Sequence, residues 1–201
     1  MRPAAVALRI GAAAGRIGVE QQLQPALQLA TPQHGDGVAQ RGDLLAQAGS
    51  GEEKERNELL LDFLTPIVKT YPSEMGIIST SLAIQCLGGY GYSDEFPVEQ
   101  YMRDIRIHPI HEGTTGIQGM DLLGRKVTMH KGKAAAIYLE EVAKAIEAAR
   151  SVRGLAPCAE KLKGAVDILK AVTGALVGIA VKGEIERFLA DATLYLEMSG
   201  I

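Results

Sequence analysis

The hydrophobic positions from residue 51 onward recur at spacings of three and four residues, which is typical of helices with one apolar face. The first set is Leu59, Leu60, Phe63, Leu64, Ile67 and Val68. Pro66 falls inside this set, and we expect it to kink or shorten the helix because proline lacks an amide hydrogen. Pro72 and Ser73 predict a second helix start, with Ser73 as its N-cap.

The second predicted helix carries one apolar face, which consists of Met75, Ile78, Leu82 and Cys86. Gly88 and Gly89 follow directly and are expected to end the helix, because glycine readily adopts the left-handed conformation of a helix terminus. Residues 90–96 predict a loop. Pro97 is suited to open a short helix that reaches Met102.

The rest of the pattern again favours helices. A locally extended stretch is predicted around Ile105, Ile107 and Pro109. Thr114 or Thr115 can cap the next helix, whose apolar face is Ile117, Met120, Leu123 and Val127. Further helices are predicted at residues 134–150, 160–169 and 183–198. Because no strand is predicted, the fold class is all-α: an antiparallel helical bundle followed by further C-terminal helices.

Composition separates the first fifty residues from the rest of the chain. They hold seven of the ten glutamines and contain no lysine, aromatic residue or cysteine. Three interpretations stay open: a targeting peptide, since three arginines precede the first acidic residue; a poorly ordered extension or linker; or sequence from a disturbed reading frame or misplaced start codon. We interpret residues 1–52 as an atypical, poorly ordered N-terminal segment.

The composition of the whole chain excludes several classes of protein. Of 201 residues, 47% are hydrophobic and 22% are charged, which argues against wholesale disorder. The formal net charge of -3 gives no electrostatic reason to expect nucleic-acid binding. Cys86 and Cys158 are too few for a disulfide scaffold and indicate a reduced, cytoplasmic setting. The longest apolar run is shorter than the roughly 20 residues of a membrane helix, so no membrane span is expected.

Unusual residues concentrate between positions 85 and 118. Gly88, Gly89 and Gly91 can let backbone approach a ligand closely, although a plain helix C-cap explains the first two equally well. His108 and His111 raise the possibility of a metal site. However, Pro109 interrupts the helix that such a site needs and no second copy of the motif exists, so we expect no metal and assign these histidines a structural role.

Glu112 is the candidate with the most specific chemistry. It precedes a predicted helix start, which favours the carboxylate anion, while burial in an apolar cleft would favour the neutral acid. A carboxylate held between these effects can be tuned to act as a general base. A surface glutamate near a helix N-terminus is the alternative that spacing alone leaves open.

Three linked motifs then resemble the C-terminal domain of the acyl-CoA dehydrogenases. They are Gln-Cys-Leu-Gly-Gly-Tyr-Gly-Tyr at 85–92, Glu-Phe-Pro-Val-Glu-Gln-Tyr-Met-Arg-Asp at 95–104, and Ile-His-Glu-Gly-Thr-Thr-Gly-Ile-Gln at 110–118. The resemblance extends from about Leu59 to Val127, and residues 121–126 are most similar to a long bacterial-type branch with an additional C-terminal helical region. It implies a family domain at residues 53–130 and an incomplete helical extension at residues 131–201.

The resemblance also implies a reaction. Members of this family use FAD to desaturate acyl-CoA thioesters between the α and β carbons, and Glu112 matches the glutamate that removes the α proton. Gln85, Gly88 and Gly89 match residues that contact the FAD pyrophosphate of a neighbouring subunit, and Thr114 matches a residue that touches FAD. The partners implied are an acyl-CoA substrate, an electron-transferring flavoprotein, and either a homo-oligomer or a complementing chain.

Several departures from the family pattern limit this expectation. His111 stands where tyrosine is commoner, and Gly116 stands where some members have a glutamine near FAD. The N-terminal helical domain and central β domain of the family have no counterpart in residues 1–50. We therefore expect a fragment that carries the base and is inactive alone. A non-catalytic helical module for oligomerisation, derived from the same family, is the alternative.

Overall fold

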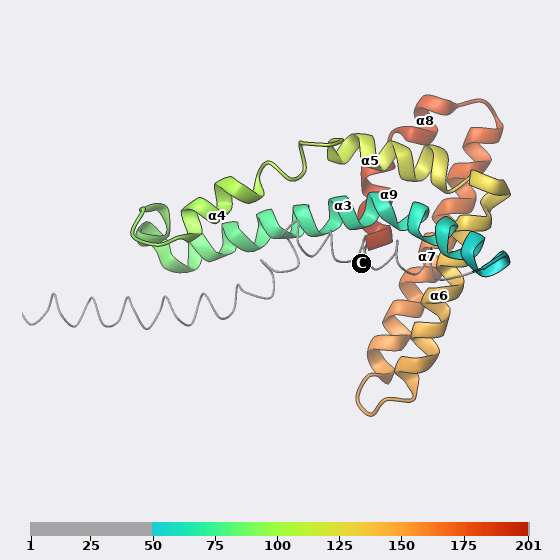
Figure 1. The fold of residues 1–201 in the computed structure, drawn as a ribbon, viewed down its shortest axis with the longest axis horizontal. Coiled ribbons are helices and arrows are strands. Elements are labelled where there is room, and N and C mark those ends of the chain that lie inside the picture. The colour runs from blue at the N-terminus through green and yellow to red at the C-terminus, as the bar shows by residue number, and fades with distance from the viewer. Residues whose placement is uncertain (1–49, 201) are drawn as a thin grey trace, which may run out of the picture. The chain divides into compact units, whose positions relative to one another are not determined.

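The computed structural model describes residues 50–200, and in this part of the chain all regular structure is helical (Figure 1). The prediction of an all-α fold is therefore confirmed there. The elements are α3 (Glu52–Leu87), η1 (Gly88–Tyr92), α4 (Val98–Ile105), α5 (Thr115–Asp121), η2 (Leu122–Lys126), η3 (Met129–Gly132), α6 (Lys133–Arg150), α7 (Ala156–Val181), α8 (Ile185–Leu189) and α9 (Ala192–Gly200). The predicted N-terminal segment lies, up to residue 49, outside the described residues.

The described chain divides into two compact units. One comprises residues 70–112, and the other comprises residues 50–69 together with 113–200. The predicted domain boundaries near residues 53 and 130 stay a prediction, since this division does not test them.

Helix α3 runs without interruption from Glu52 to Leu87, so the predicted break at Pro66 and second start at Pro72 are wrong. Proline removes one backbone hydrogen bond, but the Pro66 ring is fully buried beside the buried residues Phe63 and Ile67. Packing of this kind offsets the lost hydrogen bond, because most helix stability in proteins comes from tertiary contacts. Ser73 is accordingly a buried residue in the helix interior rather than an N-cap.

The unit of residues 70–112 is built on the last part of α3. Ala83 of α3 packs in a small core with Phe96 and Val98. Thr80 Oγ1 lies 3.1 Å from the sulfur of Met102, which links the same helix to α4. The apolar face of Met75, Ile78, Leu82 and Cys86 stays exposed instead; Leu82, for example, is 61% exposed.

The stretch that follows α4 forms turns rather than the predicted extended structure. The amide of His108 donates to the carbonyl of Ile105 at 3.1 Å, and the amide of Ile110 donates to the carbonyl of Ile107 at 3.0 Å. These short-range bonds satisfy backbone groups locally, so the β-branched residues in this stretch do not need a neighbouring strand.

The second unit places its core where α5, η2 and α9 meet. Leu122, Leu123 and Leu196 are completely buried. The ring of Phe63 stacks on Tyr138 with 5.0 Å between centroids. The Tyr138 hydroxyl donates to the carbonyl of Ser199 at 2.9 Å. The buried Lys126 pairs with Asp62 across this unit.

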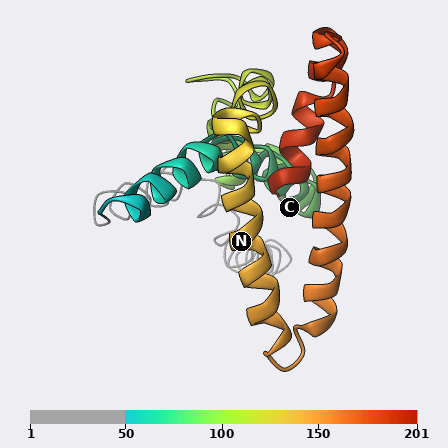
Figure 2. The same ribbon diagram turned by 90° about the vertical axis from the view of Figure 1, so that its right-hand side faces the viewer.

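Helices α6 and α7 lie side by side and form a hairpin closed by residues 151–155 (Figure 2). The predicted helix at 134–150 is confirmed by α6. Helix α7 is far longer than the predicted 160–169, because its glycines are tolerated within the helix at about 1 kcal/mol each. The predicted helix at 183–198 is divided into α8 and α9.

Judged by length and composition alone, one helix of the described residues, α7, could cross a membrane, and 6% of its apolar window is buried. The expectation of no membrane span therefore stays a prediction.

Candidate functional site

Glu112 lies between the turns that follow α4 and the start of α5. Its φ of 54° is in the left-handed region, which costs a residue with a side chain about 1–2 kcal/mol. The side chain is exposed in the described structure, so the apolar cleft expected around it is not formed by the described residues. The sequence pattern gave no sign of the left-handed conformation.

The residue before Glu112 is anchored to the preceding turn. The amide of His111 donates to the carbonyl of Ile107 at 3.1 Å. Its ring Nδ1 lies 3.1 Å from the same oxygen, and this contact is a hydrogen bond when Nδ1 carries the proton. The ring of His108 lies 5.5 Å from that of His111. Both histidines therefore have local contacts, and their structural role stays a prediction.

The residues after Glu112 begin a helix. Thr114 is the N-cap of α5, and its Oγ1 accepts from the amide of Ile117 at 3.4 Å, which confirms the predicted cap. Gly113 has a φ of 98°, and a Cβ at this position would lie 2.6 Å from Nε2 of Gln118. Lys69 Nζ donates to the carbonyl oxygen of Gly113. The positive φ is therefore the reason for glycine here, since the flexible Gln118 side chain could move away from a Cβ.

The predicted flavin contacts of α3 gather at the end of that helix. Gln85, Gly88 and Gly89 are all exposed. Gly88 has a φ of 61°, so it acts as the left-handed C-terminal cap. A Cβ at Gly88 or Gly89 would meet no atom within 4 Å, so the space beside both glycines is open to a ligand.

Lys69 is the residue near this site that sequence analysis missed. It lies half-buried on α3 directly after Ile67 and Val68. A lysine adjoining an apolar helical face is the only signal that could have marked it. Spacing could not show that it reaches a carbonyl 44 residues further along the chain.

The clearest electrostatic effects lie away from these residues. The pKa of Glu140 is lowered mainly by a hydrogen bond from Arg56, and the pKa of Glu141 is lowered mainly by one from Lys144. Burial raises the pKa values of Tyr138 and Tyr195.

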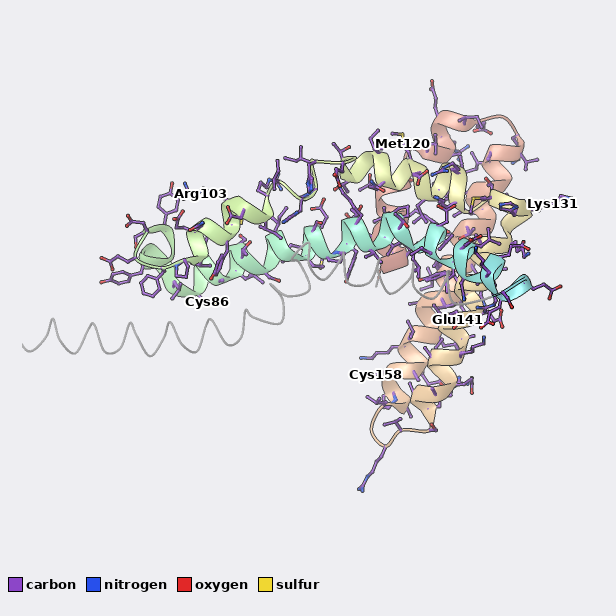
Figure 3. The ribbon with its side chains drawn as sticks, in the orientation of Figure 1. Cys86, Arg103, Met120, Lys131, Glu141 and Cys158 are labelled. Atoms are coloured by element: carbon purple, nitrogen blue, oxygen red, sulfur yellow. The ribbon has the colours of Figure 1, made fainter. Side chains whose placement is uncertain are left out.

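Within residues 50–200, no three histidine, cysteine or acidic side chains gather as metal ligands. Cys86 at the end of α3 and Cys158 near the start of α7 are free and exposed (Figure 3).

Comparison with known proteins assigns this segment to a family. Residues 44–127 match the family model described as "Acyl-CoA dehydrogenase, C-terminal domain". The 3-methylmercaptopropionyl-CoA dehydrogenase of Ruegeria pomeroyi is 42% identical over 99 residues, which are 49% of this chain and 17% of that protein. A butyryl-CoA dehydrogenase of Syntrophomonas wolfei is 39% identical over 101 residues, which are 50% of this chain and 17% of that protein.

A third acyl-CoA dehydrogenase is similar to the same chain. The broad-specificity linear acyl-CoA dehydrogenase of Mycobacterium tuberculosis is 41% identical over 75 residues, which are 37% of this chain and 12% of that protein. Residues 44–127 therefore resemble the C-terminal domain of the acyl-CoA dehydrogenase family. The matched segment spans about one sixth of the length of the first two relatives.

Proposed function

We propose that this chain carries the general base and part of the flavin-contacting surface of an FAD-dependent acyl-CoA dehydrogenase. The observation that carries the proposal is the Glu112-Gly113-Thr114 sequence between anchored turns and a capped helix, inside the segment that matches the family. The class of reaction is the removal of two hydrogens across the α and β carbons of an acyl-CoA thioester.

Glu112 is the residue that would accept the α proton. The α hydrogen of a thioester is a weak acid in water, so the reaction needs a base held at the correct position. An exposed carboxylate at a fixed turn can meet a substrate that approaches from outside this chain. Bound FAD would supply the acceptor for the hydride that leaves the β carbon.

The remaining site residues have groups that fit a flavin nucleotide. The Gln85 side chain offers both amide donors and a carbonyl acceptor at an exposed helix end. The open space beside Gly88 and Gly89 allows a pyrophosphate to approach the backbone. The Thr114 oxygen accepts from Ile117, so its hydroxyl hydrogen is available to donate.

The proposal includes partners that would complete the site. Gln85, Gly88 and Gly89 would serve the flavin of a neighbouring subunit, and Glu112 with Thr114 would serve the flavin of their own site. A second copy or a complementing chain would provide the rest of the acyl pocket, because the match covers 17% of the relatives. Electrons would pass to an electron-transferring flavoprotein in the cytoplasm.

A flavin titration of the 201-residue chain tests this proposal. Saturable quenching of FAD fluorescence is expected, and Gln85→Ala should weaken it. When a complementing chain supplies the rest of the acyl pocket, acyl-CoA should bleach the bound flavin, at a rate that Glu112→Gln lowers by roughly 10²- to 10⁴-fold without changing FAD affinity. Absence of FAD binding by the unchanged chain, or full reduction in Glu112→Gln, would contradict the proposal.

One observation favours the alternative of an assembly module. Met75, Ile78 and Leu82 form an exposed apolar face on α3, and Gln85 lies on the same face one turn further along. Since Gln85 is assigned to the flavin of a neighbouring subunit, this continuous surface favours a second copy of the chain as its partner. Association through this face does not require catalysis.

A further inference from the structure

The side chain of Lys69 contacts the turn that carries Glu112. The ammonium of Lys69, on α3, donates to the carbonyl oxygen of Gly113, the residue directly after Glu112. We propose that Lys69 is a positioning residue that keeps Glu112 in its left-handed conformation and so fixes where its carboxylate is presented. Its catalytic significance rests on the proposed role of Glu112 as the base.

The conformation of Glu112 needs such a restraint. A φ of 54° is disfavoured for any residue with a Cβ, so an unrestrained chain would return to negative φ. On one side, His111 is anchored through the carbonyl of Ile107. On the other side, Thr114 is fixed as the cap of α5.

Gly113 is the flexible link between these two anchors. Glycine has a wider choice of φ and ψ than any other residue, and here it also adopts a φ of 98°. A hydrogen bond to its carbonyl therefore restrains the turn at the residue with the widest choice of φ and ψ. We therefore expect the Lys69 hydrogen bond to affect the position of the Glu112 carboxylate rather than the stability of α3.

The chemistry of lysine suits this role. Its ammonium makes a charge-assisted hydrogen bond to a carbonyl, which is stronger than a neutral one. Its long stem can lie along the partly buried surface of α3 while the ammonium reaches the turn. Arginine keeps a charged donor of similar reach, whereas methionine keeps the stem and removes the donor.

Nuclear magnetic resonance of the full 201-residue chain, without flavin or substrate, tests the proposal. A residue with positive φ shows a strong Overhauser effect between its own amide and α hydrogens. This signal at Glu112 should fall to the level of helical residues in Lys69→Met and persist in Lys69→Arg. The matched control is Lys54→Met on the same helix, where the lysine is exposed and lies 3.9 Å from Glu58, within its own helix. Persistence of the signal in Lys69→Met would overturn the proposal.

A measurement on the unchanged chain covers the case in which Lys69→Met fails to fold. With labelled lysine nitrogen and glycine carbonyl carbon, a coupling through the hydrogen bond should connect Lys69 Nζ to the Gly113 carbonyl. Its absence would overturn the proposal without any variant.

The outcome is separable from that of the proposed function. A chain that shows the tether but binds no FAD contradicts the proposed function and leaves the tether established. In a preparation that reduces flavin with acyl-CoA, Lys69→Met should lower kcat by roughly 10- to 100-fold while KM changes little, and Lys69→Arg should restore most of the rate. An unchanged kcat would show that the tether does not position the base.

Discussion

Glycine at position 91 is required by the close approach of η1 to the last part of α3. A Cβ there would lie 2.6 Å from the carbonyl oxygen of Ile84 and 2.9 Å from its Cα, and both are backbone atoms that cannot rotate away. The open glycines of α7 present the opposite case, since a Cβ at Gly164 meets no atom within 4 Å. Identical residues are thus under different constraints, which depend on what surrounds them.

Replacing Gly91 by alanine should lower the free energy of unfolding by about 1–3 kcal/mol, because the backbone of α3 and η1 must move apart. Gly164→Ala should instead raise it by up to about 1 kcal/mol, because alanine favours a helix more than glycine does. Urea denaturation followed by circular dichroism measures both values. Equal effects of the two substitutions would contradict the steric explanation.

At the scale of elements, the start of α3 is joined to α6 by an ionic cluster. Arg56 donates to Glu140 at 3.1 Å and to Glu141 at 2.6 Å, and Lys144 lies 2.9 Å from Glu141. Glu140 is exposed and Glu141 is half-buried, so solvent screens the pairs and the cluster contributes modestly. Its clearest consequence is a dependence of stability on pH.

Stability should fall as acid protonates these carboxylates. The pKa values of Glu140 and Glu141 are lowered from 4.5 in the folded state. The stabilising contribution is therefore complete above 4.5 and is lost as pH falls through the lower folded values. Arg56→Met should therefore flatten the fall in Tm as the pH is lowered into the acid range, because it removes a guanidinium that lowers the pKa of both glutamates.

The matched control is Arg187→Met, since Arg187 pairs at 3.0 Å with Glu184, three residues before it in the chain, and not across to α6. Thermal scans at low and high salt should show the difference between the two variants shrinking as salt screens the cluster. An identical pH profile for Arg56→Met and the unchanged chain would exclude a role for this cluster.

Helix boundaries show how far local signals extend. The Thr114 cap, the end of α3 before Gly88 and the span of α6 were all predictable, because a cap or a glycine specifies them locally. Pro66 and Pro72 misled the prediction, since burial of the Pro66 ring within α3 overrides a local tendency to end the helix.

At the scale of the whole molecule, the exposed face of α3 bears on assembly. Ile78 is 50% exposed and Leu82 is 61% exposed, although the sequence pattern groups them as one apolar face. A second copy that covers this face would remove apolar surface from water at about 25 cal/mol per Å².

The double substitution Ile78→Ser and Leu82→Ser should therefore reduce self-association and leave the helical content unchanged. Light scattering across a concentration series measures the mass, with circular dichroism as the check on folding. Val152→Ser, at a residue that is also 50% exposed but lies after α6, is the matched control. A monomeric unchanged chain, or equal masses for the double variant and the unchanged chain, would contradict a second copy as the partner of this face.

The sequence by itself determined the helical class, the capped start of α5 and the family resemblance from about Leu59 to Val127, because periodicity, caps and linked motifs are properties of neighbouring residues. The candidate residues Glu112, Thr114, Gln85, Gly88 and Gly89 could also be named from their motifs. The left-handed backbone of Glu112, the tether from Lys69 and the burial of Pro66 and Lys126 were decided only by tertiary structure. Each depends on groups that are distant along the chain, and local sequence patterns do not show which distant residues come into contact.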